Sequence, residues 1–274
     1  MKNILVHADL GKSFRMRMEY AAALAGRNGA RIDALYVIPL FEMPGNSRYS
    51  MPKAVLEERS QAEHAEAESA KAIFDEVVAA TGVEARWTIE VGDYVETLCG
   101  FARTSDLLLM GQRNAADLKV SDSPPPDRII LRAGRPVLVT PHVKFDQNAG
   151  SHILLAWDGS RESARAMHDA MPLLLAADEV DVVTFAENKS AAAKFASMES
   201  AVNFLSENGV KAKGESLVLS QISVGESLLN RVVDRGANML VMGGYGQSRL
   251  REIVLGGVTR TVLEHMSVPV LMSR

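Results

Sequence analysis

The chain has 274 residues and a net charge of −4, enough for one large or two modest domains. A hydrophobic share of 47% and a charged share of 23% are typical of a globular protein and exclude a disordered chain. Lys and Arg form no basic stripe, no apolar run nears the roughly 20 residues that span a bilayer, and Cys99 is the single cysteine. We therefore expect a cytoplasmic protein without disulfides, with neither nucleic acid nor a membrane as partner.

Three landmarks recur in the same order in the two halves of the sequence. NILVHADLG (Asn3–Gly11) matches HILLAWDGS (His152–Ser160), LLLMGQ (Leu107–Gln112) matches MLVMGGY (Met239–Tyr245), and RPVLVT (Arg135–Thr140) matches VPVLMS (Val268–Ser273). Each half is therefore one copy of a unit of about 130 residues. The polar stretch 141–151 separates the copies, and we expect domains over residues 1–143 and 150–274.

Short apolar runs alternate with longer helical patterns along both halves. In the first half a long charged helix is expected over 54–82, before the strands at 107–112 and 135–140. In the second half, strands are expected over 153–157, 181–185, 213–219, 239–242 and 269–272, alternating with helices over 160–176, 191–209 and 224–236 and a last helix that ends near His265. Continuous apolar strands that alternate with helices predict an α/β fold of two tandem doubly wound domains, each with a parallel sheet flanked by helices.

A glycine-rich segment follows the apolar run MLVM of the second half. Its spacing is Gly243-x2-Gly246-x9-Gly256, with Gly257 next, and Asp158 ends the first strand of the same half. Both places lie at carboxyl ends of strands, where doubly wound sheets bind ligands and where the N–H groups of a glycine loop attract phosphate. Neither GxxxxGK[ST] nor GxGxxG is present, so spacing alone leaves open a loop that only turns the chain.

Over nearly its whole length the sequence resembles the universal stress proteins in their tandem two-domain form. ILLAWDGS, MLVMGGYGQSRLREIVLGGVTRTVLEH and the closing PVLM carry the resemblance. It implies a five-stranded parallel sheet in each domain and ATP, or AMP or ADP, at the carboxyl edge, with Mg²⁺ as a further expectation. The residues that it implies for nucleotide binding are Asp158, Phe185, Met242, Gly243, Gly246, Gly256, Gly257, Val258 and Thr259.

These positions have distinct expected roles. The resemblance places Asp158 against the ribose and base, the backbone of Phe185 against the adenine, and Met242 in the wall of the site. The three motif glycines would surround the phosphates. Gly257 departs from the family pattern, which has Ser or Thr there, and the loss of one neutral hydrogen bond costs about 1 kcal/mol, nearly tenfold in affinity. We expect weaker or altered nucleotide binding, with Thr259 or Ser248 as a substitute hydroxyl.

The first half lacks the glycine pattern. Gly111 remains after Met110, but Asn114 stands where the second glycine is expected, and the prolines of 124–126 remove N–H donors from the segment. Asp9 is retained. We expect no triphosphate to bind there in this way, and an unrelated small ligand stays an open alternative.

The residues leave three functions open. We favour a nucleotide-binding regulatory module that responds to stress, and we assign no catalytic or metal-binding residue, since the histidines show no metal-ligand spacing. A slow ATP hydrolase or self-phosphorylating enzyme is the alternative, and a structural stress protein without a nucleotide is the third. The resemblance also implies that the closing strands, Val137–Thr140 and Val268–Met272, approach each other and pair the two domains as a pseudo-dimer. A homodimer of such chains is a further expectation.

Overall fold

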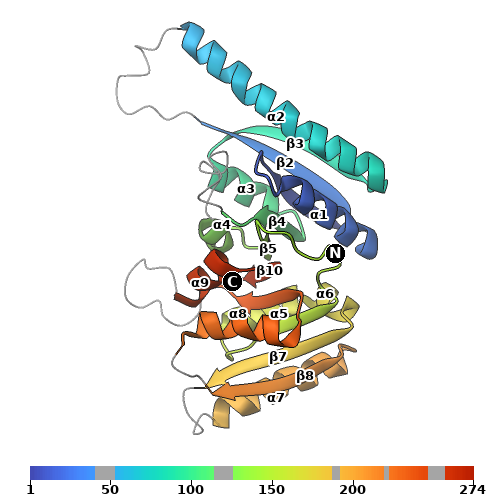
Figure 1. Cartoon of the computed structure of the whole chain (residues 1–274), viewed down its shortest axis with the longest axis vertical. Coiled ribbons are helices and arrows are strands. Elements are labelled where there is room, and N and C mark those ends of the chain that lie inside the picture. Colours follow the sequence, from blue (N-terminus) through green and yellow to red (C-terminus); the bar gives the residue numbers. More distant parts are fainter. Residues whose placement is uncertain (41–52, 114–125, 187–191, 219–221, 246–256) are drawn as a thin grey trace.

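The computed structural model describes residues 1–40, 53–113, 126–186, 192–218, 222–245 and 257–274. Strands and helices alternate along both halves (Figure 1). The strands are β1 (Asn3–Ala8), β2 (Arg31–Pro39), β3 (Ala85–Gly92), β4 (Leu107–Gly111), β5 (Val137–Thr140), β6 (His152–Ala156), β7 (Glu179–Ala186), β8 (Ala212–Val218), β9 (Met239–Gly243) and β10 (Val270–Ser273). The helices are α1 (Phe14–Asn28), α2 (Lys53–Thr81), α3 (Tyr94–Ala102), α4 (Pro126–Arg132), α5 (Arg161–Asp169), α6 (Met171–Ala176), α7 (Ala192–Glu207), α8 (Val224–Arg235) and α9 (Gly257–His265).

The two halves join into one ten-stranded sheet in the order β3-β2-β1-β4-β5-β10-β9-β6-β7-β8. Each half contributes five parallel strands, with its first strand between the second and the fourth, which confirms the doubly wound parallel fold. The junction is antiparallel, with Leu271 opposite Leu138 and Val270 opposite Val139. The expected approach of the closing strands is therefore confirmed.

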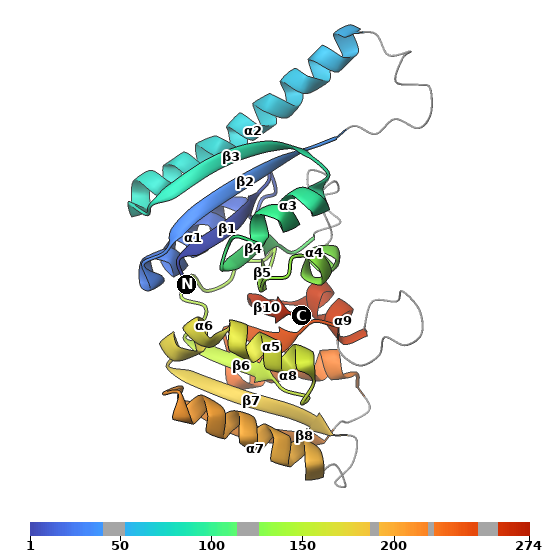
Figure 2. The same ribbon diagram turned by 180° about the vertical axis from the view of Figure 1, so that it is seen from behind.

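The sheet twists strongly between its outer strands (Figures 1 and 2). As a result, the carboxyl ends of β2, β7 and β8 emerge on the same side of the molecule, although the two halves meet antiparallel (Figure 1). Both candidate ligand edges consequently face the same side.

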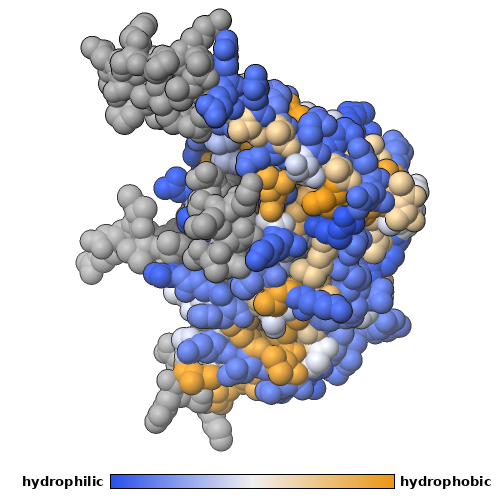
Figure 3. All heavy atoms as spheres, turned by 45° about the horizontal axis from the view of Figure 1, so that its top comes forward, coloured by the Kyte–Doolittle hydropathy of each residue, from blue (hydrophilic) through white to orange (hydrophobic). Residues whose placement is uncertain are grey.

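Alternating strand residues divide the core into two layers. Along β1, Ile4 and Val6 join the cluster under α1, α2, α5, α6 and α7, while Leu5 joins the cluster under α3, α4, α8 and α9. A parallel sheet covered on both faces needs apolar residues at successive positions, which is why the strands read as continuous apolar runs. On the face that Figure 3 presents, hydrophobic groups lie between hydrophilic residues.

Local sequence explains where several helices begin and end. Ser223 and Glu226 form a reciprocal capping box at the start of α8, and Gly236, with φ +64°, ends it in the left-handed conformation. Gly209, with φ +86°, follows α7 as the Asn-Gly pair predicts. The single helix expected over 160–176 is wrong: α5 ends at Asp169 and α6 begins anew, because Pro172 cannot donate the N–H that a continuous helix needs.

The segment between the halves is anchored to both of them. The Tyr20 hydroxyl donates to the Ala149 carbonyl at 3.1 Å, and the Tyr20 and Phe145 rings meet edge to face at 5.3 Å. The Gly150 N–H donates to the Asn238 side chain at 2.9 Å. The connection is therefore packed against the domains at these residues.

None of the helices that the structure describes is both long and apolar enough to cross a membrane.

Candidate functional site at the carboxyl edge of the second half

The turn after β6 presents an acidic side chain at the switch point between β7 and β9. The Ser160 N–H donates to Asp158 Oδ1 at 2.9 Å, and Gly159 between them has φ +75°. The Ser160 side chain then accepts from the Ser163 N–H at 3.1 Å and caps α5. Asp158 itself is exposed, so local hydrogen bonds hold a carboxylate at the sheet edge with its second oxygen toward solvent.

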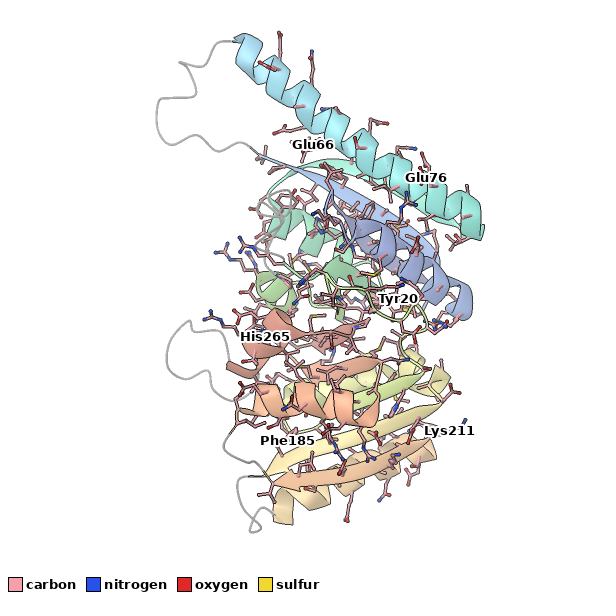
Figure 4. The ribbon with its side chains drawn as sticks, viewed as in Figure 1. Tyr20, Glu66, Glu76, Phe185, Lys211 and His265 are labelled. Atoms are coloured by element: carbon pink, nitrogen blue, oxygen red, sulfur yellow. The ribbon has the colours of Figure 1, made fainter. Side chains whose placement is uncertain are left out.

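The neighbouring strand β7 supplies the next candidate. The Trp157 N–H donates to the Val183 carbonyl at 2.8 Å, which ties the turn after β6 to the end of β7. Phe185, two residues further along, is half-buried and lies near the carboxyl end of β7. Lys211, just before β8, lies at the opposite edge of the sheet (Figure 4). The structure thus brings Phe185 and Asp158 to adjacent strand ends.

Strand β9 ends in two glycines that each allow a close approach. A Cβ on Gly243 would lie 2.6 Å from the Glu162 carbonyl carbon and the Ser163 nitrogen, and one on Gly244 would lie 2.9 Å from the Ile130 side chain. The Gly244 N–H also donates to the Ser273 carbonyl at 2.8 Å. These two glycines therefore have a packing role that is independent of any ligand.

The first turn of α9 lies beside the end of β9. Tyr245 has φ +61°, and its N–H faces the Thr259 hydroxyl oxygen at 3.4 Å. Thr259 is 3% exposed and Val258 is half-buried, whereas Gly257 is exposed and has no described atom within 4 Å of an added Cβ. The Thr259 hydroxyl oxygen therefore already accepts one hydrogen bond from the chain, and its use as a substitute phosphate ligand stays a prediction.

The remaining candidates differ in their placement. Met242 is 4% exposed and belongs to the core layer under α3, α4, α8 and α9, so its side chain packs in the core beneath the strand edge. Gly246, Gly256 and Ser248 lie outside the described residues. Asp158, Phe185, Gly243 and the first turn of α9 are thus gathered at one strand edge.

In the first half an arginine fills the corresponding place. Asp9 makes the same turn, with its Oδ1 accepting from the Gly11 N–H at 2.8 Å, but its Oδ2 accepts from Arg17 at 2.5 Å. Arg17 is 1% exposed, its Nε donates to the His7 carbonyl at 3.2 Å, and its guanidinium occupies the space beside Gly111 that a Cβ would need. In the second half, Ala166 stands the same number of residues after Asp158.

His7 completes this buried cluster. It is 1% exposed, its Nδ1 lies 3.7 Å from Asp9 Oδ2, and its ring meets that of Tyr94 edge to face. Burial lowers the pKa of His7 to about 4; Asp9 acts against this shift and Arg17 adds to it. His7 is therefore neutral at pH 7. No feature of the sequence around Arg17 pointed to this cluster.

Two further features lie away from the candidate edge. A cavity of about 210 Å³ at the seam between the halves is lined by residues that include Asp106, Arg135, His168 and Asp169 and by none of the candidates.

Three potential metal ligands also meet across strands, a cluster that sequence spacing could not reveal. They are His152, Glu179 and Asp181, with ligand atoms within 4.8 Å of one another. Lys213 and Arg235 form ion pairs with these carboxylates. The chain's own cations therefore already neutralise the cluster.

Comparison with known proteins gives a consistent result. The model of the Universal stress protein family matches residues 1–141 and 151–274. Universal stress protein Slr1230 of Synechocystis sp. is 27% identical over 293 residues, which cover all of both chains. The crystal structure of a universal stress protein from Archaeoglobus fulgidus DSM 4304 aligns with a TM-score of 0.76 and 19% identity over 99% of this chain and 98% of that one.

Proposed function

Because the chain belongs to the universal stress protein family, we propose that it is a regulatory stress-response module that binds an adenine nucleotide in its second half. The observation that carries the proposal is the difference between the two carboxyl edges. In the second half the edge presents the exposed Asp158 and, at the described start of α9, the exposed Gly257, whereas Arg17 fills the equivalent place in the first half. We retain the domain limits 1–143 and 150–274 and a cytoplasmic location as parts of this proposal.

The described residues fit the chemistry of a nucleotide. The exposed oxygen of Asp158 suits a ribose hydroxyl, which donates a hydrogen bond, and the end of β7 at Phe185 offers backbone groups to a base. Within the described residues α9 begins with Gly257, Val258 and Thr259. The first N–H groups of a helix have no partner inside it and carry the positive end of its dipole. Phosphate oxygens are the natural ligands of such a helix start.

The site also predicts how the affinities for AMP, ADP and ATP compare. Gly257 leaves the helix start without the expected hydroxyl, so the phosphate contacts that the described residues offer there are backbone N–H groups. We therefore propose that AMP, ADP and ATP differ less in affinity than a site with a full set of phosphate donors would allow. Mg²⁺ would be held by the nucleotide phosphates.

The regulatory role follows from where the site lies. Met242, Gly243 and Gly244 lead from the candidate edge to the Ile130 side chain and the Ser273 carbonyl, at the junction of the two halves. A nucleotide that favours one arrangement of this strand end would shift the population of states at the junction by its difference in affinity. Binding and release, without turnover, are sufficient for such a module.

Calorimetric titration with ATP, ADP and AMP, with and without Mg²⁺, tests the proposal. We expect one nucleotide to bind per chain. Asp158→Ala should bind it about tenfold more weakly, because the substitution removes a hydrogen bond to a charged group. Asp178→Ala should bind it as tightly as the parent. Asp178 is exposed and precedes β7 at the opposite edge, so it matches the charge change. Phosphate released in the same samples distinguishes a module from a hydrolase, and the absence of binding by all three nucleotides would refute the proposal.

A further inference from the structure

Strand β3 forms one outer edge of the ten-stranded sheet (Figure 2). It runs for eight residues, and all of them except the last, Gly92, are half-buried or exposed, with Val91 60% exposed. Outer strands of this length present a row of backbone groups that can pair with a further strand. The question is which strand the side chains of β3 suit.

The ladder to β2 determines which backbone groups point outward. At one end the Ile32 N–H donates to the Glu84 carbonyl at 2.9 Å, and at the other the Leu40 N–H donates to the Gly92 carbonyl at 3.2 Å. Bonding alternates along a parallel ladder, so the even-numbered residues of β3 face β2. Ala85, Trp87, Ile89 and Val91 therefore direct their N–H and C=O groups away from the sheet.

The side chains of β3 fall into two sets. Trp87 and Ile89 pack against the core layer under α2, where the Trp87 ring lies 5.3 Å from that of Phe74. Arg86 and Glu90 lie on the other face with Thr88 between them, and both are exposed. Within the described part of the chain, neither Arg86 nor Glu90 has a side-chain hydrogen bond or ion pair.

We propose that β3 pairs antiparallel with β3 of a second copy of this chain, about a two-fold axis through Thr88. In this register Arg86 lies opposite the partner's Glu90, and symmetry repeats that pair on the other side of the axis. Trp87 lies opposite the partner's Ile89, so the outward backbone groups exchange hydrogen bonds and the apolar layer continues beneath both α2 helices. Aromatic–aliphatic and opposite-charge pairs of this kind stabilise antiparallel strands.

The neighbouring registers are less favourable. Only shifts that keep odd residues opposite odd residues let the outward backbone groups bond. A register centred on Trp87 places Glu84 opposite the partner's Glu90, and one centred on Ile89 places Glu90 opposite the partner's Thr88 and Arg86 opposite the partner's Gly92. The Thr88 register alone among these three pairs opposite charges.

The other outer strand, β8, lacks this combination. Its charged residues Lys213 and Glu215 are engaged within the chain, by Glu179 and by Arg231 and Arg235. Gly214 stands between them and offers no side chain to a cross-strand pair. Charge complementarity therefore points to β3 as the edge that meets a second copy.

Sedimentation velocity of the nucleotide-free protein over a range of concentrations tests the interface. A strand pair buries less than the roughly 1,200 Å² of a stable interface, so we expect a reversible dimer with a dissociation constant of about 10 μM or weaker. Arg86→Glu and Glu90→Arg each place like charges opposite one another twice and are expected to raise that constant about tenfold or more.

The double variant Arg86→Glu/Glu90→Arg exchanges the charges and is expected to restore the parental dimer. Lys211→Glu makes the same charge change as Arg86→Glu at the exposed amino end of β8 (Figure 4) and is expected to leave the dimer unchanged. A parent that stays monomeric at every concentration overturns the proposal. So does a dimer with the same constant in both single variants, because it would use another surface. Urea unfolding of each variant verifies that the exposed substitutions leave the monomer folded.

Discussion

Replacement of Gly257 by serine tests whether the first turn of α9 contacts phosphate. Gly257 is exposed, and within the described part of the chain no atom lies within 4 Å of the position that a Cβ would take, so a serine side chain fits beside these residues. Its hydroxyl would add one hydrogen bond to a phosphate oxygen. Such a bond contributes about 1 kcal/mol, which corresponds to a dissociation constant five- to tenfold lower.

The backbone effect of losing a glycine needs its own control. Any residue with a Cβ restricts the unfolded chain and favours the helix by about 0.5–1 kcal/mol, whether or not it has a hydroxyl. Gly257→Ala has this effect alone, so the comparison of Ser with Ala isolates the hydroxyl. Calorimetric titration of the three proteins with ATP and AMP, beside thermal unfolding without nucleotide, measures both quantities.

The affinities of the two variants show whether or not the start of α9 contacts the phosphates. If Gly257→Ser binds ATP more tightly than Gly257→Ala and both unfold at similar temperatures, the start of α9 meets the phosphates. Equal affinities of the two variants would show that the hydroxyl points away from the nucleotide, and the reasoning from the helix N-terminus would fail. An affinity gain that is the same for adenosine as for ATP would also contradict a phosphate contact.

Two stability measurements follow from the packing of buried groups. Gly243→Ala would place a methyl group 2.6 Å from Glu162 and Ser163 backbone atoms, and we expect urea unfolding to show a free energy of unfolding lower by about 1–3 kcal/mol. Gly26→Ala in α1, where the structure describes no atom within 4 Å of the added Cβ, is the control and should not lose stability. An equal change in the two variants would contradict the close approach at Gly243. The pKa of buried His7 falls to about 4 when the protein folds, so its contribution is complete above about pH 6.5 and is lost as the pH falls toward 4, at up to about 1.4 kcal/mol per pH unit. From pH 7 to pH 5 the free energy of unfolding should therefore decrease less for His7→Phe than for the parent. Equal decreases in the two proteins would mean that folding does not shift the pKa of His7.

The fold could be predicted because its signals are local and repeated. Each buried strand is a short continuous apolar run, and the same run recurs at the same place in both halves, as in Asn3–Gly11 and His152–Ser160. The approach of β5 to β10 followed from the resemblance and is confirmed by the pairing of Leu138 with Leu271; that the two strands run antiparallel is a finding of the structure. The break at Pro172 was missed because the apolar spacing on both sides of it continues at helical period.

The candidate site could be predicted only in part, because glycines look alike in a sequence. Gly243 and Gly244 are explained by contacts with α5 and with Ile130, which come from distant parts of the chain. Among the residues that the structure describes, nothing lies within 4 Å of a Cβ added to Gly257, so contacts with these residues do not explain the glycine. Gly243 is a motif glycine and Gly257 stands at the motif's Ser or Thr position, and spacing alone cannot tell that the first is required by close packing whereas the second lies at an exposed helix start.

The comparison of the two halves explains why one turn can serve two purposes. Asp9 and Asp158 each accept the N–H two residues later, so the turn itself needs an Asp in both halves. What differs is the second carboxylate oxygen, which Arg17 neutralises in the first half and solvent reaches in the second. A buried arginine needs a buried counter-charge, because an unpaired one costs several kcal/mol. Asp9 is therefore retained as the partner of Arg17, and its presence is no sign of a nucleotide site in that half.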